Sequence, residues 1–78
     1  MLPNSTLSQK RRIVDLLRNQ AGGATTLDMV SKLDVLRPGA RICELRQQGY
    51  DILTAWDEVY TGLGRHRVGR YVLMGEPR

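Results

Sequence analysis

The spacing of apolar side chains is helical over the first part of the chain and alternates from Asp51 onward. Apolar residues from Ile13 to Leu17 recur at helical spacing, which predicts a first helix over about residues 7–20. Thr6 lies three residues before a glutamine, which is the spacing of a capping box, so the helix is expected to begin there. The change of period predicts helices first and strands afterwards.

Glycines and prolines mark the limits of two further short helices. Gly22 suits a left-handed turn after the first helix, and a second helix of about two turns follows, with Thr25 or Thr26 as its cap. In the third helix Pro38 suits the first position, since it has no backbone N–H to leave unpaired. Gly49 suits the position just beyond the end.

Two strands joined by a glycine-containing loop are predicted after the helices. The segments "DILTAWDEVY" and "RVGRYVLM" have β-rich patterns, and "TGLGRH" between them predicts a loop of about six residues. Trp56 and Tyr60 share the side of Ile52, so they are expected to pack in the core and within the hairpin. The alternative for these two rings is a platform on which bases stack. "GATT" can add a short third strand at the sheet edge.

Length and composition limit the functions that the chain can have. A chain of 78 residues suffices for one core, so a single domain over residues 1–78 is expected, with its core at about 7–74. No apolar run has the length of a signal peptide or a membrane span, and Cys43 is the only cysteine, so the cytoplasm is the expected location and no membrane is an expected partner. With one histidine and no recognisable ligand or nucleophile motif, we expect no metal, no cofactor and no enzymatic activity.

The charge of the chain favours a polyanionic partner. The formal net charge is +4, and the segment from Thr61 to Leu73 contains no acidic residue. Arg65, His66 and Arg67 lie there in the predicted hairpin loop, from which they can reach phosphates or a minor groove. The alternative is a loop kept soluble by its charge.

The third helix carries side chains that can distinguish bases in a major groove. Arginine matches two acceptors of guanine, glutamine a donor and an acceptor of adenine, and glutamate the amino group of cytosine. The candidates for DNA contact on this helix are Arg37, Arg41, Glu44, Gln47 and Gln48. The alternative is an ordinary solvated surface in which Arg41 pairs with Glu44. Arg41 also suits a structural role, with its stem packed and its head bonded to the neighbouring strand.

A helix N-terminus and a group of basic residues elsewhere in the chain are further candidates for DNA contact. Thr26 is foremost a cap, although a helix N-terminus can also bind a backbone phosphate. Lys10, Arg11 and Arg12 on the first helix suit a solvated surface.

Three helices followed by a two-stranded hairpin are the element order of a winged helix-turn-helix, an α+β fold. The segments "TTLDMVSKLDVLRPGARICELRQQGYDI" and "VGRYVL" also resemble the small helix-turn-helix proteins common in bacteriophages and prophages. In that family a Thr-Leu pair opens the second helix, Arg-Ile-x-x-Leu-Arg and a glycine end the third, and Tyr-x-Leu follows. The resemblance covers about residues 7–74.

The expected function is sequence-specific binding of double-stranded DNA in the cytoplasm of a bacterial host. The protein would act as a phage-type transcriptional regulator or an excisionase-like architectural factor, and as a homodimer if its site is a palindrome. The alternative is a protein-interaction module that binds a host or phage protein without nucleic acid. A third interpretation is binding of double-stranded RNA by its shape.

Overall fold

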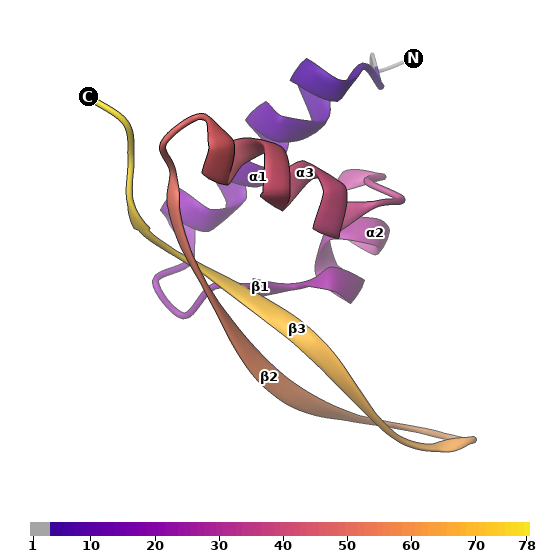
Figure 1. Cartoon of the computed structure of the whole chain (residues 1–78). Coiled ribbons are helices and arrows are strands. Elements are labelled where there is room, and N and C mark those ends of the chain that lie inside the picture. Colours follow the sequence, from indigo (N-terminus) through magenta and orange to yellow (C-terminus); the bar gives the residue numbers. More distant parts are fainter. Residues whose placement is uncertain (1–3) are drawn as a thin grey trace.

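The computed structural model describes residues 4–78, in which three helices cover one face of an antiparallel sheet (Figure 1). The helices are α1 (Thr6–Asn19), α2 (Thr26–Leu33) and α3 (Pro38–Gln47). The strands are β1 (Ala24–Thr25), β2 (Asp51–Thr61) and β3 (Gly64–Gly75), in the sheet order β1-β3-β2. The predicted α+β order of helices followed by a hairpin is confirmed, and so is the short third strand.

The core lies between the helices and the inner face of the sheet and is aliphatic. No polar or charged side chain among residues 4–78 is buried. Pro38 is buried, and the buried residues of the hydrophobic cluster are Ile13, Val14, Leu17, Ala24, Met29, Val35, Ile42, Leu45 and Ile52. They come from every helix, from two of the strands and from the connection between α2 and α3, so the burial of this one cluster fixes how the helices lie on the sheet.

The start of α1 differs from the prediction by one residue. Ser5 is the cap, because its extended backbone lets its Oγ accept from the N–H of Ser8 at 3.1 Å. The capping box expected from Thr6 is therefore wrong, and the Nε2 of Gln9 donates to the Asn4 carbonyl instead.

The turn after α1 uses a different glycine from the one predicted. Gly23, with φ +85°, takes the left-handed conformation, whereas Gly22 does not. The N–H of Gly23 donates to the Gln20 carbonyl at 2.9 Å, which closes the turn just before β1. A left-handed backbone favours glycine because it has no side chain to clash there.

Thr25 is the cap of α2 and forms a complete capping box. Its Oγ1 accepts from the N–H of Asp28, and the Asp28 carboxylate accepts from the N–H of Thr25, each at 3.1 Å. The backbone hydrogen bond from Thr25 lowers the pKa of Asp28 below its ordinary value, and the ammonium of Lys32 lowers it further. Thr26 is the first helical residue and is half-buried.

We expect Thr25→Ala to lower the free energy of unfolding by about 1 kcal/mol, the usual effect of losing a cap. The Asp28 carboxylate has a lower pKa in the folded protein than in the unfolded chain. It therefore contributes fully to the free energy of unfolding at any pH above its pKa in the unfolded chain, and this contribution is lost as the pH falls through its pKa in the folded protein. Urea unfolding from pH 7 to pH 2 measures both effects. In Asp28→Asn the acid-dependent part should shrink, and an identical pH profile in variant and parent would contradict this role of the carboxylate.

Helix α3 begins and ends where the sequence predicts. Pro38 is its first residue, and Gly49, with φ +102°, lies just beyond its end. The N–H groups of Gly49 and Tyr50 donate to the carbonyls of Arg46 and Leu45, each at 3.1 Å. The chain therefore leaves the helix in a fixed direction and enters β2.

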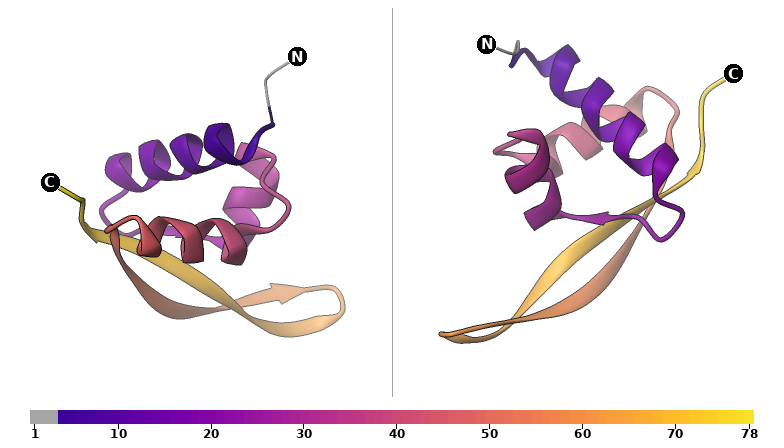
Figure 2. Two further views of the ribbon diagram at one scale, coloured as in Figure 1. Left: turned by 45° about the horizontal axis from the view of Figure 1, so that its top comes forward. Right: turned by 180° about the vertical axis from the view of Figure 1, so that it is seen from behind.

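The predicted six-residue hairpin loop is wrong, because the strands pair up to Thr61 and Gly64. Only Gly62 and Leu63 form the turn, and Gly64 takes a positive φ of 122°. The hairpin is consequently long and extends beyond the helices (Figure 2). Trp56 and Tyr60 lie in this uncovered part, where their side chains are 61% and 71% exposed, so the prediction that they pack in the core is also wrong.

Candidate nucleic-acid interface

Among the five candidates on α3, the side chains available to a partner are those of Arg37, Gln47 and Gln48. Arg37 precedes the helix, is exposed, and makes no side-chain hydrogen bond or ion pair within residues 4–78. Gln47 is exposed near the other end, and its Nε2 makes only a long contact of 3.9 Å with Cys43 Sγ. Ile42 and Leu45 are buried, so Gln47 lies on the outer surface of the helix.

Arg41 and Glu44 interact with each other and with α1. The Nε of Arg41 lies 2.7 Å from a carboxylate oxygen of Glu44, in an ion pair that is not aligned as a hydrogen bond. An Nη1 of the same guanidinium donates to Thr6 Oγ1 at 3.1 Å, and the Arg41 side chain is only 16% exposed. The bond to Thr6 holds the start of α1 against α3. The ion pair between Arg41 and Glu44 is the one that the sequence left open as an alternative.

The bond to the neighbouring strand that was expected of Arg41 is made by Arg46. Its Nε and Nη2 donate to the carbonyl of Ile52 at 3.1 and 2.7 Å, and Nη2 also donates to Thr54 Oγ1 at 2.8 Å. Arg46 thereby fixes the angle between α3 and the hairpin. The sequence suggested this bond for Arg41 alone, because helical spacing does not show which arginine faces the strand.

The hairpin separates the three basic candidates onto two faces. Arg65 and Arg67 pair across the strands with Tyr60 and Glu58, and residues opposite each other in an antiparallel ladder have their side chains on the same face. His66 alternates to the other face. All three residues lie in β3, so the prediction that they lie in a loop is wrong, whereas contact of His66 with DNA from the other face stays a prediction.

Arg65 and Arg67 share their face with two exposed aromatic rings. The guanidinium of Arg67 lies 4.9 Å from the centre of the Trp56 ring, and Arg65 lies 3.9 Å from a carboxylate oxygen of Glu58. This is the face that carries Ile52 into the core farther along the strand. We call Trp56, Tyr60, Arg65 and Arg67 the inner hairpin surface.

The tip of the hairpin and the start of α3 lie toward the same end of the molecule (Figure 2). Arg37 is at that end of α3, so it and the inner hairpin surface can face one extended partner.

Residues 8–76 match a protein family described as the winged helix-turn-helix domain. The chain belongs to this family. No curated protein and no solved structure matches the chain.

A winged helix-turn-helix domain indicates DNA binding in general terms. Domains of this kind are typically not enzymes. In a winged helix-turn-helix domain, α2 and α3 form the helix-turn-helix and the β2–β3 hairpin is the wing. Within residues 4–78, no three His, Cys, Asp or Glu side chains gather as metal ligands. None of the helices in the same range is long and apolar enough to cross a membrane.

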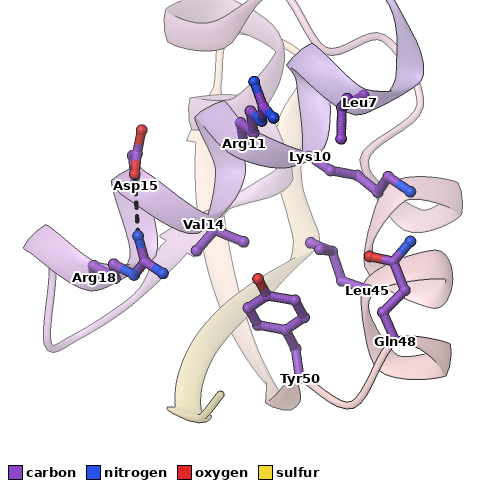
Figure 3. Close-up of a pocket in the computed structure, with 9 residues that line it drawn as sticks. All are labelled: Leu7, Lys10, Arg11, Val14, Asp15, Arg18, Leu45, Gln48 and Tyr50. Carbon is purple, nitrogen blue, oxygen red and sulfur yellow. Dashed lines mark hydrogen bonds and ion pairs between the residues drawn. The ribbon is translucent and has the colours of Figure 1, made fainter. Parts of the chain in front are cut away.

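Gln48 lies apart from the outer surface of α3. It lines a pocket of about 380 Å³ between α1 and the end of α3, where its side chain lies near Lys10 (Figure 3). Arg18 on α1 and Tyr50 in the connection between α3 and β2 line the same pocket. The structure therefore groups Gln48 with the first helix of this winged helix-turn-helix domain, although it is exposed as predicted.

Proposed function

We propose that the protein binds double-stranded DNA in a sequence-specific manner, as a phage-type transcriptional regulator or an excisionase-like architectural factor of a bacterial cytoplasm. The observation that carries the proposal is that Arg37, at the start of α3, and Gln47, near its end, are exposed with side chains free for a partner, in a domain whose wing carries Arg65 and Arg67. A surface of solvated residues alone would need neither the adenine-matching amide nor the arginine at these places. Residues 1–78 act as one domain in this proposal.

Each group has a distinct role when α3 lies in a major groove. Gln47 bonds to the edge of an adenine, and Arg37 bonds to a guanine or to a phosphate beside it. Arg65 and Arg67 bond to phosphates along the wing. Thr26 lies at the start of α2, where backbone N–H groups favour a further phosphate. Arg41 and Glu44 act indirectly, because they hold α3 in position.

A single domain of this size covers a small DNA site. One such module buries about 600 to 1,000 Å² of protein surface, which is little for tight binding. We therefore propose that it binds as a homodimer on a palindromic site, with each α3 in a separate major groove.

Selection of binding sites from a random duplex pool tests the proposal. The parent protein should enrich one motif, and Gln47→Ala should relax the preference at one position, with a loss of about 1 to 3 kcal/mol for the preferred site and little for other sites. Its melting temperature should be nearly unchanged, since Gln47 is exposed.

Gln48→Ala is the matched control for this selection. It removes the same amide from the adjacent position, which faces the pocket beside α1, so the enriched motif should stay that of the parent. If the parent enriches no motif and binds no duplex at low salt, the protein-interaction module is the better explanation. A parent motif that Gln47→Ala retains in full would remove Gln47 from the site.

A further inference from the structure

The most exposed of the large apolar side chains in the described part of the chain is at the very tip of the wing. Leu63 is 94% exposed and forms the turn with Gly62. Only Gly64 in this turn has a positive φ, so the backbone at Leu63 accepts any ordinary residue. A polar side chain would fit the turn equally well, and no packing within the domain explains a leucine there.

The turn holds Leu63 in a fixed direction. The N–H of Leu63 donates to Thr61 Oγ1 at 3.1 Å, and the hydroxyl of Thr61 lies 3.4 Å from the Gly64 carbonyl that accepts from it. The strands are paired as far as Thr61 and Gly64, so the turn sits at the end of a continuous ladder. Leu63 thus lies at the end of a hydrogen-bonded hairpin rather than in an open loop.

The surroundings of Leu63 identify the kind of partner. Arg65 and Arg67, which follow Leu63 in the chain, lie on the inner hairpin surface. Trp56 and Tyr60 on the same surface are largely exposed. The single carboxylate on this part of the surface, that of Glu58, accepts from the Tyr60 hydroxyl at 3.3 Å and lies near Arg65. An apolar tip with arginines behind it suits a partner with phosphates outside and stacked apolar surfaces inside, which describes duplex DNA.

We propose that the wing is a DNA-bending arm and that Leu63 inserts between two stacked base pairs from the minor groove. The proposal rests on the proposed DNA binding and adds to it the distortion of the DNA and the residue that produces it. An apolar side chain that enters a base step replaces part of the stacking and opens the step toward it, which kinks the duplex. Arg65 and Arg67 then bond to phosphates beside the kink, and the exposed rings of Trp56 and Tyr60 lie against the sugars.

Bending measured by energy transfer between dyes on the two duplex ends tests the proposal. With the enriched duplex, the parent should produce a bend of about 20 to 90°, and Leu63→Ser should bind with a much smaller bend. Its affinity for the intact duplex should fall roughly 3- to 30-fold, because a serine replaces little of the lost stacking. On a duplex already mismatched at the kinked step, the two proteins should bind nearly equally.

Leu53→Ser is the matched control. Leu53 is also largely exposed, but it pairs with Val72 on the outer face of the sheet, so the bend should stay that of the parent. Neither serine should change the melting temperature much, since neither leucine is buried. A parent that binds the duplex without bending it, or a Leu63→Ser variant that bends it equally, overturns the proposal and leaves DNA binding intact. Absence of binding to any duplex overturns both.

Discussion

Gly23→Ala should lower the midpoint of thermal unfolding by roughly 12 to 24 °C, whereas Gly22→Ala, one residue earlier, should unfold at almost the same temperature as the parent. A β-carbon at position 23 would lie 2.1 Å from the Tyr71 carbonyl oxygen and 2.8 Å from a methyl of Val72. The backbone has no room to move away, because Ala24 pairs with Tyr71 in the sheet and is itself buried. The positive φ of Gly23 adds the strain that any side chain has in that conformation.

The combined cost of the clash and the strain is about 3 kcal/mol or more, a large part of the 5 kcal/mol or so that stabilises a marginal small domain. Gly22 is the matched control, since a β-carbon there meets no atom within 4 Å and its φ is not positive. Circular dichroism during thermal unfolding compares the two variants. Equal midpoints would show that the turn between α1 and β1 is not built as described.

Local signals predicted the helices well, because the residues that cap a helix act within a few positions of its end. Pro38 and Gly49 were placed correctly for this reason, and Thr25 was one of two predicted caps. The error between Gly22 and Gly23 arose because two adjacent glycines are equally able to take a positive φ. The pairing of Ala24 with Tyr71, far apart in the sequence, decides which of them does.

The wing was predicted less accurately, because its form depends on pairing between strands. Glycines at 62 and 64 suggested a loop, but the ladder continues to Thr61 and Gly64 and takes Arg65 and Arg67 into a strand. Alternation placed Trp56 correctly on the side of Ile52. Alternation does not show how far the helices extend over the hairpin, so it could not show that Trp56 is exposed.

Replacement of both Arg65 and Arg67 by alanine should reduce the dependence of DNA binding on salt more than any other pair of substitutions on the domain. Each arginine that holds a phosphate releases counterions, so a plot of log K against log salt should lose about two units of slope. Affinity near 0.1 M salt should fall on the order of 10- to 100-fold for all duplexes alike. The fold should be retained, because both side chains are exposed.

Two matched variants separate phosphate contact from a general effect of charge. Lys10→Ala with Arg11→Ala removes the same two charges from the pocket beside α1, away from the wing, and should change the slope much less. Arg65→Lys with Arg67→Lys keeps the charges but loses the stacking of Arg67 on the Trp56 ring, so the slope should stay near that of the parent. Equal slopes for both alanine pairs would mean that net charge alone drives binding. The wing would then have no direct contact with the phosphates, and the orientation of the domain on DNA would rest on α3 alone.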